Sequence, residues 1–500
     1  MKKIAVLLIV VFGVSVTALM AQSRHFNAQS LGMGSGGTAY VDGYHANFVN
    51  PANLMLDNHH KKTTIGFVNV GVKAGGSLAN VAVYNKYLTT GQLIAGDTRT
   101  NMLNEWFGEN SSNMRQLSTT ISIAPFGFSH RSSEQAFSLA SRVRVTEQFA
   151  INKGMAELLT YGLDSDKFAT PVPVDFNTNT VVFAEVSLGY ARHLDFIEIP
   201  DLFFAKDIKL YAGIAPKYLY GIYTANLDFN STLQMDRGSA SDPFTIHHRF
   251  NYSLQTIGLL SQQLQEYEAA YNLDKNAELG DYVDYSGDDL GEAQATGFGL
   301  DIGGTLEMDV SALPIPLFID KDKTLRISMS LTDLGKLNFD QTPSSVYADA
   351  EFSYVGAQDE DDFDSFFDNL SDSLQNDVYG RFDSEEIDGI NYSLPGMYNF
   401  GASLEMGKLL VALDFGMGFN NNGINSKRSA LNLGAQYRLL GFMPIRVGTR
   451  IGGYSSATFS AGFGLDFNFL EFSVGASTVS NSENFGTSAG VAWSGLIIRF

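Results

Sequence analysis

Apolar and polar residues alternate along many stretches of this chain, most regularly near its C-terminus. Between Thr458 and Asn468 every second side chain is apolar and the residues between them are polar or glycine. A period of two is the spacing of side chains on the two faces of a β-strand. The apolar face consists of Phe459, Ala461, Phe463, Leu465 and Phe467. We therefore predict an amphipathic strand in this segment.

The same pattern marks fifteen stretches that we interpret as candidate strands. A barrel with both chain ends on one side of the membrane needs an even number, so one candidate is wrong or one is missing. The alternation is least certain in two stretches: Thr63–Val72, which is among the fifteen candidates, and Phe244–Leu254, which is not. We predict fourteen strands, with sixteen as the alternative. The candidates are Thr63–Val72, Leu78–Tyr87, Gln116–Phe126, Ala136–Thr146, Val181–His193, Ile208–Asn226, Thr296–Asp309, Thr324–Leu331, Met397–Met406, Lys408–Gly418, Ser429–Arg438, Ile445–Gly452, Thr458–Asn468, Leu470–Thr478 and Ala489–Phe500.

Three features distinguish a membrane barrel from a soluble β-sandwich. Many candidate strands run for about 9–11 residues, the length that a tilted strand needs to cross a bilayer. Short turns such as Glu405–Lys408 alternate with long loops, and the final stretch Ser494–Phe500 ends on an aromatic residue. That ending resembles the signal by which barrel assembly machinery recognises a C-terminal strand. We predict an all-β, transmembrane antiparallel β-barrel with an N-terminal plug segment and long extracellular loops, closed because lipid cannot satisfy an open strand edge.

The N-terminus has the order of a secretory signal. Met1–Lys3 is positive, Ile4–Leu19 is apolar, and Ala21 offers a small residue for cleavage. The chain has no cysteine, and the rest of it has no apolar run of the roughly 18 residues that a spanning helix needs. We predict a signal peptide at residues 1–21, a plug-like segment at 22–58 and a barrel at 59–500. The expected location is the bacterial outer membrane, in contact with its lipid and lipopolysaccharide.

Composition narrows the classes of partner. The formal net charge of −21 argues against binding to nucleic acid.

The two longest loops, Leu227–Ala295 and Thr332–Gly396, are predicted to lie outside the cell, and both are acidic. From Asp349 to Asp388 there are fourteen Asp and Glu residues and one Arg. They form either a solvated surface or a site for a cation or partner. Helices are predicted at Phe363–Leu374 and Ser261–Leu273.

Motifs of enzyme chemistry occur without the context that each requires. Gly32–Gly37 matches a dinucleotide-binding pattern, but no βαβ unit surrounds it. Gly486–Gly490 matches the pattern of a nucleophile elbow, but it leads into the last predicted strand. The pairs His59–His60 and His247–His248 would point to opposite faces of a strand, which makes them poor metal ligands as pairs. We therefore expect no catalytic residues, no metal and no cofactor.

Charged residues on the polar faces of the predicted strands should point into the lumen. They can form a salt-bridge network that fills a closed barrel, or they can line a polar pathway, and both interpretations stay open. These candidates are Arg142, Arg144, Arg326, Arg438, Arg446, Arg450, Glu185, Asp301, Glu307, Asp414, Asp466 and Glu471.

Two segments near the N-terminus resemble a known family. Leu31–Tyr40 is rich in glycine, and Asn47–Leu54 contains Asn-Pro-Ala. Together they resemble the N-terminal signature of the long-chain fatty-acid transporter (FadL) and PorV-like superfamily of outer-membrane barrels. Leu331–Phe339 and Leu394–Tyr398 resemble motifs of a related Bacteroidetes-type family of unknown function.

The resemblance implies that Gln22–Asn58 plugs the barrel and that hydrophobic ligands pass to a lateral opening. Elementary geometry agrees with a plug, since proline fixes its own φ and keeps the preceding residue extended, while glycine allows a close approach to the wall. The residues expected to shape the plug are Gly34, Gly36, Gly37, Asn50, Pro51 and Ala52.

Three functional hypotheses follow. The first is a barrel that binds or transports a hydrophobic or small amphiphilic solute. The second is a scaffold or shuttle component of a secretion or surface-attachment system, as in PorV-like relatives, with a secretion protein as partner. The third and weakest is an outer-membrane hydrolase that uses Ser488.

Overall fold

The structure, a computed structural model, describes most of the chain. The predicted signal peptide at 1–21 and the helix predicted at Phe363–Leu374 lie outside the described residues. The described residues are 27–162, 166–197, 199–236, 245–283, 293–313, 322–355, 381–420, 427–453, 455–479 and 487–500.

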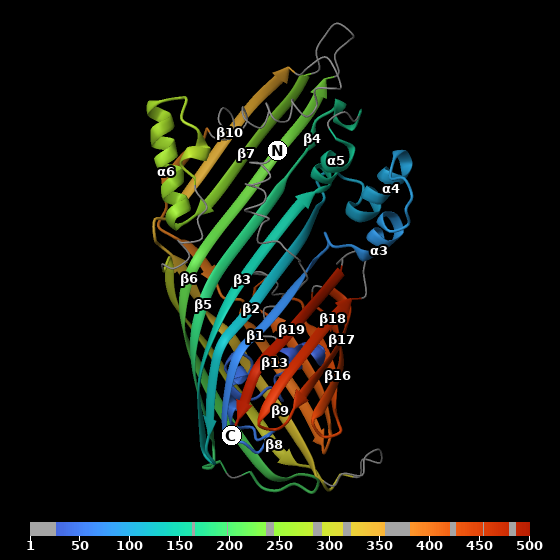
Figure 1. Cartoon of the computed structure of the whole chain (residues 1–500), viewed down its shortest axis with the longest axis vertical. Coiled ribbons are helices and arrows are strands. Elements are labelled where there is room, and N and C mark those ends of the chain that lie inside the picture. The colour runs from blue at the N-terminus through green and yellow to red at the C-terminus, as the bar shows by residue number, and fades with distance from the viewer. Residues whose placement is uncertain are drawn as a thin grey trace.

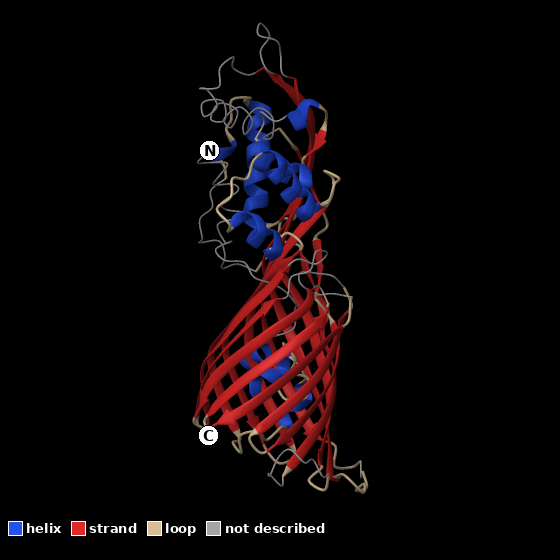
Figure 2. Cartoon of the chain, turned by 90° about the vertical axis from the view of Figure 1, so that its right-hand side faces the viewer, coloured by secondary structure: helices blue, strands red, loops and turns tan. Residues whose placement is uncertain are grey.

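Within the described residues, fourteen antiparallel strands form a closed barrel (Figures 1 and 2). The ring closes where the first strand pairs with the last, from Thr64 opposite Arg499 to Gly76 opposite Thr487. The predicted number of fourteen is confirmed. The barrel strands are β1 (Thr63–Gly76), β2 (Met114–Arg131), β3 (Gln135–Asn152), β5 (Phe176–His193), β6 (Lys206–Asp236), β8 (Ala295–Asp309), β9 (Lys323–Phe339), β13 (Met397–Met406), β14 (Leu409–Gly418), β15 (Ala430–Leu439), β16 (Met443–Gly452), β17 (Ser455–Asp466), β18 (Leu470–Val479) and β19 (Thr487–Arg499).

The surplus candidate was Leu78–Tyr87, and its prediction as a strand is wrong. After β1 the chain forms helix α3 (Val81–Val83) and helical turn η3 (Tyr84–Leu88). The side chain of Asn80 accepts a hydrogen bond from the backbone N–H of Val83 at 3.1 Å, which starts the helix. This local capping outweighs an alternation that is only weakly regular.

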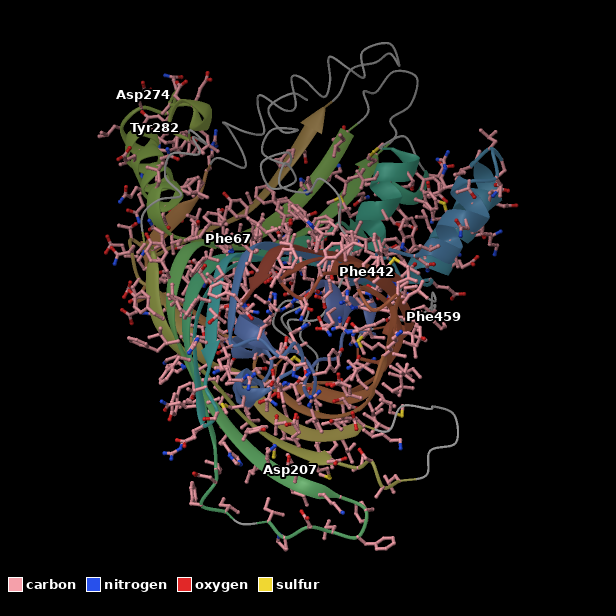
Figure 3. All side chains as sticks on the ribbon, turned by 60° about the horizontal axis from the view of Figure 1, so that its bottom comes forward. Phe67, Asp207, Asp274, Tyr282, Phe442 and Phe459 are labelled. Carbon is pink, nitrogen blue, oxygen red and sulfur yellow. The ribbon has the colours of Figure 1, made fainter. Side chains whose placement is uncertain are left out.

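The two faces of the wall have the polarity that the alternation predicts. On β17, Phe459 and Phe463 are exposed, whereas Ser460 and Asp466 are buried inside the ring. Figure 3 shows Phe459 on the outer side of the wall. Among the described residues, no helix has both the length and the apolar character to cross a membrane.

Above one side of the barrel the sheet continues as an extension (Figure 1). Strand β6 runs for 31 residues and pairs beyond the barrel with β7, which pairs with β10. The two segments predicted as the longest loops, Leu227–Ala295 and Thr332–Gly396, are therefore not loops throughout, because they contain strands that pair with β6 and with each other. The added strands are β4 (Val172–Pro173), β7 (Thr245–Thr256), β10 (Ser344–Val355), β11 (Asp383–Glu386) and β12 (Ile390–Ser393).

Helices cover one face of this extension (Figure 2). Helix α6 confirms the helix predicted at Ser261–Leu273. It is held to the sheet by a 2.7 Å hydrogen bond between the hydroxyls of Ser261 and Ser344. The helices outside the barrel, besides α3 and η3, are α4 (Gly96–Phe107), α5 (Lys153–Tyr161), η4 (Asp166–Ala169), α6 (Gly258–Leu273) and η5 (Leu279–Asp281).

The described part of the predicted plug-like segment lies inside the barrel as α2 (Ala28–Gly32), η1 (Gly43–Phe48) and η2 (Pro51–Met55). It touches the wall through glycines: a Cβ atom on Gly213 of β6 would overlap the backbone of Pro51 and Ala52. Side chains then fix the contact. The amide of Asn50 donates to the carbonyl of Thr38 and to the hydroxyl of Thr305, both at 2.9 Å.

Adding one methyl group at this contact is expected to unseat the plug. The substitution Gly213→Ala forces η2 away from β6, so protease should cleave the plug more readily in the folded barrel. The matched control is Gly304→Ala, whose Cβ would meet only the Tyr211 carbonyl at an ordinary 3.7 Å. Equal protease resistance in both variants would contradict the close contact.

A histidine in the extension makes its packing sensitive to pH. Burial lowers the pKa of His248 on β7 to about 4, since the charged ring loses its hydration there. Its ring packs edge-on against Phe352 at 5.4 Å between centroids. A depressed pKa stabilises the fold above the ordinary value of about 6.5, and this contribution is lost as the pH falls towards 4.

Near-ultraviolet circular dichroism should therefore show the extension melting at a lower temperature as the pH falls from about 6.5 to about 4. His248→Phe keeps a ring in place and removes the titration, so this variant should lose less of its melting temperature. An identical loss in both proteins would exclude His248 as the cause.

Candidate functional site

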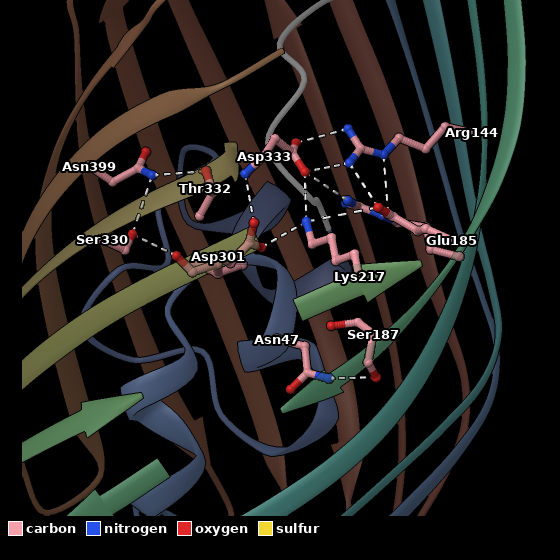
Figure 4. A network of polar contacts seen from close by, with 12 residues as sticks. Asn47, Arg144, Glu185, Ser187, Lys217, Asp301, Ser330, Thr332, Asp333 and Asn399 are labelled. Atoms are coloured by element: carbon pink, nitrogen blue, oxygen red, sulfur yellow. Dashed lines mark hydrogen bonds and ion pairs between the residues drawn. The ribbon is translucent and has the colours of Figure 1, made fainter. Parts of the chain in front are cut away.

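A cluster of six charged side chains lies in the barrel lumen (Figure 4). Three are cations and three are carboxylates, so the cluster is electrically balanced. They come from five adjacent strands, β3, β5, β6, β8 and β9, and all are at most 6% exposed. We call them the charge cluster: Arg142, Arg144, Glu185, Lys217, Asp301 and Asp333.

Ion pairs connect its members through Glu185 and Asp333. Arg142 bonds to Glu185, and Arg144 donates to Glu185 at 3.2 Å. Two guanidinium nitrogens of Arg144 also reach Asp333, at 2.9 and 2.5 Å. Lys217 binds Asp333 at 2.6 Å and Asp301 at 2.8 Å. A buried charge is tolerated only when paired and hydrogen-bonded, and this arrangement meets that condition.

A bulge in β9 brings Asp333 into the cluster. The pairing of β8 with β9 shifts between Leu300 and Ile302, and Asp333 has a left-handed φ of 56°. The extra residue reverses the alternation along β9, so the carboxylate turns inward. The backbone N–H of Asp333 then donates to Asp301 at 2.6 Å. Within the motif Leu331–Phe339, this bulge is the feature that directs the aspartate side chain into the lumen.

The structure places all twelve residues that were predicted to face the lumen on the inner side of the wall. Arg326 bonds to Glu307 at 2.7 Å and to Glu405 at 3.0 Å. Asp414 accepts a hydrogen bond from the backbone of Thr38 in the plug at 2.8 Å. The twelve therefore separate into groups, and the charge cluster contains Arg142, Arg144, Glu185 and Asp301. The others are Arg326, Glu307, Asp414, Arg438, Arg446, Arg450, Asp466 and Glu471.

A second ionic group lies near the C-terminus of the barrel. Ligand atoms of His59, Asp466 and Glu471 approach one another within 4.8 Å. Arginines already bind these carboxylates, because Arg438 donates to Asp466 at 2.6 Å and Arg499 bonds to Glu471. Such close cations oppose a bound metal ion, so we interpret the group as an ion-pair network.

Sequence reasoning missed Lys217 and Asp333. Lys217 is the charged residue of an otherwise apolar inward face on β6, between Ala215 and Leu219, and that contrast was a usable signal. Asp333 follows the end of the strand predicted at Thr324–Leu331, and only the bulge determines its direction.

The plug contacts the charge cluster through Phe48 of η1. The guanidinium carbon of Arg142 lies 4.3 Å from the centre of the Phe48 ring, and the Lys217 ammonium lies 5.5 Å from it. Cations within about 6 Å of a ring face are attracted to it. Asn47, one residue before, donates to the Ser187 carbonyl of β5 at 3.3 Å (Figure 4). Helical turn η1 is therefore bound to the wall at the level of the charge cluster.

The wall has a weak line between β1 and β2. Within the described residues, the ladder that joins these strands contains one residue pair, Thr63 with His130. On its other side β1 pairs with β19 at twelve positions. If the antiparallel register of Thr63 with His130 is continued along both strands, Val68 lies opposite Pro125. Proline has no N–H to donate to the neighbouring strand. We call this line the β1–β2 seam.

Both strands are irregular at this point. Val68 has a φ of 52°, which is rare for a β-branched residue. On β2 the register with β3 shifts between Ile123 and Gly127. On the outer surface the rings of Phe67 and Phe126 lie 5.9 Å apart across the seam, so side chains cover what the backbone leaves unpaired.

Tyr44 of the plug covers the same line from inside. Its ring lies against Gly66 of β1 and Gly127 of β2, where a Cβ atom on either glycine would overlap it. Tyr44 also packs with Phe48 and Ala140. The short helical turn η1 thus contacts the β1–β2 seam and the charge cluster together.

Apolar side chains lie on the extension side of the charge cluster. A cluster that includes Phe183, Leu219 and Phe339 is fully buried there, and the Arg144 guanidinium lies 5.1 Å from the Phe183 ring. Farther along β5 and β6, the ring of Phe176 stacks on Phe229 at 4.9 Å. The row continues to β7, where Phe250 and Tyr252 lie 6.0 and 6.4 Å from Phe229. We call these four rings the aromatic row.

The structure also places the enzyme-like motifs. Ser488 lies within β19 and pairs with Gly75 of β1, so its position lacks the strand-to-helix turn of a nucleophile elbow. The segment Gly32–Gly37 lies in the plug, where Gly34 approaches Gly448 of the wall.

Comparison with known proteins gives a family and several similar folds. A family model described as a family of unknown function (DUF5723) matches residues 67–477. No curated protein matches the chain in sequence. Similar solved structures include the P. putida toluene transporter TodX, with a TM-score of 0.46 and 10% identity over 96% of this chain and 99% of that one.

Two further structures are similar to a comparable degree. The Ralstonia pickettii toluene transporter TbuX has a TM-score of 0.43 and 13% identity over 95% of this chain and 99% of that one. A Pseudomonas aeruginosa FadL homologue has a TM-score of 0.42 and 11% identity over 97% of this chain and 100% of that one. The FadL group is the one that the N-terminal segments resemble.

Removing one cation from the charge cluster is expected to destabilise the barrel. Lys217→Met leaves Asp301 without its 2.8 Å partner and should lower the free energy of unfolding by about 3–5 kcal/mol. Urea unfolding in detergent measures the loss. The double variant Lys217→Met/Asp301→Asn restores the charge balance of the cluster and should regain more than half of the lost free energy of unfolding. A double variant no more stable than the single one would refute the pairing.

Proposed function

This chain belongs to the family of unknown function DUF5723, and we propose that it is an outer-membrane barrel that admits a small hydrophobic or amphiphilic solute and releases it sideways through the β1–β2 seam. The observation that carries the proposal is the seam itself, a wall joint with one ladder pair that the plug covers from inside.

The entry side has partly exposed aromatic rings. Phe176, Phe229 and Tyr252 of the aromatic row are half-buried, whereas Phe250 is fully buried, and the row leads along the extension towards the buried cluster around Phe183 and Phe339. Stacked rings bind apolar molecules through area and dispersion, with little demand for a specific polar group. A hydrophobic solute from outside the cell would follow these surfaces to the charge cluster.

The charge cluster closes the direct route to the periplasm. An apolar molecule cannot replace the ion pairs of Arg144 and Asp333 without leaving buried charges unpaired. The helices of the plug lie in the lumen of the barrel (Figure 2). A solute that reaches Arg142 is then beside the β2 bulge, because the Ser141 hydroxyl donates to the Phe126 carbonyl at 3.3 Å.

Release would require a displacement of η1. Tyr44 would leave the seam and Phe48 would leave Arg142 together, because both belong to one short helical turn. The strands could then separate between Phe67 and Phe126 at small cost, since few ladder bonds hold them. Lipid receives the solute directly.

A barrel scaffold for a secretion or surface-attachment system is the second candidate function. The observation that favours it is the extension, whose uncovered face carries polar residues such as Arg249, Asn251 and Glu351. A scaffold needs no passage through the wall, so an experiment that locks the seam separates the two functions.

The lock uses a cysteine pair, because the natural chain has no cysteine. Phe67→Cys and Phe126→Cys are joined by a short thiol cross-linker that a reductant cleaves. Cells that express the protein should lose uptake of the hydrophobic fluorophore N-phenyl-naphthylamine down to the level of cells without it. Reductant should restore uptake, since lateral release needs the strands to part.

The matched control is Phe137→Cys with Tyr190→Cys. These rings lie 5.2 Å apart across β3 and β5, which pair along their whole length. Cross-linking there should leave uptake unchanged. If the two cross-links have the same effect, or neither has any, release through the β1–β2 seam is wrong.

A further inference from the structure

The connection between β5 and β6 is unusually apolar for a chain that turns outside the membrane. It lies at the end of the barrel opposite the extension (Figure 1). Within it, the structure describes residues 194–197 and 199–205. We call this connection the foot. Its exposed large apolar side chains are Phe196, Ile197, Leu202, Phe203 and Phe204.

Phe203 protrudes more than any described apolar residue of the barrel wall, of which Phe298 on β8 is the most exposed at 74%. Phe203 is 100% exposed and Phe196 is 74% exposed, whereas Leu413 in the middle of β14 is 41% exposed. Wall residues are shielded by neighbouring strands, so full exposure means that Phe203 stands clear of the protein. A tight turn presents it, because the backbone of Leu202 donates to the Ala205 carbonyl at 2.8 Å.

The base of the foot packs on the lipid-facing side of the wall. Ala205 is fully buried in a cluster with Met308 and Val310, to which Ile208 and Leu306 add partly buried surface. Along β8, Leu306 and Met308 alternate with inward residues such as Thr305 and Glu307, whose side chains reach plug and lumen partners. The foot is thus continuous with the outer, apolar surface of the barrel.

We propose that the foot inserts into the periplasmic leaflet of the outer membrane, with Phe203 and Phe196 among phospholipid acyl chains near the head groups. Aromatic residues are enriched at the interfaces of membrane proteins, and an apolar patch in water calls for a partner. Lipid is the occupant that the outer surface of the wall already contacts, and the foot extends that contact.

The charged residues next to the apolar tip fit a position of the foot at the level of the lipid head groups. Lys206 and Lys209 follow the apolar tip, and Lys209 pairs with Asp207 at 2.6 Å. Asp207 is labelled at this end of the barrel in Figure 3. Charged side chains next to an inserted apolar tip remain in the head-group layer, where ammonium groups meet phosphate.

The foot joins β5 to β6, and β6, which is 31 residues long in all, continues into the extension on the same side of the barrel (Figure 1). In sequence, the segment 310–322 between β8 and β9 repeats Ile-Pro, Leu-Phe and Lys-Asp in the same order as 199–207.

The test uses nitroxide labels on single cysteines introduced into the cysteine-free protein. The protein is reconstituted in nanodiscs of phosphatidylethanolamine and phosphatidylglycerol. Electron paramagnetic resonance then compares collisions of each label with oxygen, which concentrates in lipid, and with a nickel chelate, which stays in water. For Phe203→Cys the oxygen-to-nickel ratio should be several-fold higher than for a label in water.

Two control labels give the oxygen-to-nickel ratios expected in lipid and in water. Val447→Cys on β16 is 56% exposed on the lipid-facing wall, and Leu273→Cys at the end of α6 is 91% exposed in the extension. A Phe203 label with the ratio of the Val447 label supports insertion. A ratio equal to that of the Leu273 label overturns the proposal, because the Phe203 position would then lie in water. Phe196→Cys repeats the measurement if the first variant does not fold.

Discussion

The structure depends on the rule that backbone N–H and C=O groups in hydrocarbon must bond to one another. An unpaired group costs several kcal/mol there, so the fourteen strands have to form a ring. The join of β1 with β19 satisfies this rule at twelve positions. The β1–β2 seam departs from it, with Pro125 opposite the strained Val68, and a departure under so strict a rule calls for a functional explanation.

The lumen obeys a related constraint. Buried polar side chains on the inward faces need partners, and the plug and the charge cluster supply many of them, as Asp414 with Thr38 and Arg144 with Asp333 show. Glycine wall residues such as Gly213 let the plug backbone touch the sheet, and the Asn50 amide donates to the Thr38 carbonyl within the plug. Because Phe48 and Tyr44 belong to one short helical turn, the same part of the plug contacts both the charge cluster and the β1–β2 seam.

Much of the fold could be predicted from the sequence, because side-chain alternation is a local property. The strand from Thr458 to Asn468, the aromatic end at Phe500 and the plug signature around Asn50 needed no tertiary information. The helix at Val81–Leu88 was missed because a cap at Asn80 outweighs weak alternation. Strand β10 was missed, and β7 was only a weak stretch at Phe244–Leu254, because a polar sequence does not reveal that these two segments, about a hundred residues apart, pair with each other.

The sequence by itself determined which residues face lipid and which face the lumen, since a period of two assigns each side chain to one face. It also showed that the N-terminal segment is rich in glycine and resembles the plug of a known barrel family. Only the tertiary structure decided which lumenal charges meet. The bulge at Asp333 turns a carboxylate inward against the local alternation, and Lys217 becomes its partner through strands that are distant in sequence. Register across a closed ring is a property of the whole sheet, so no single segment of the chain encodes it.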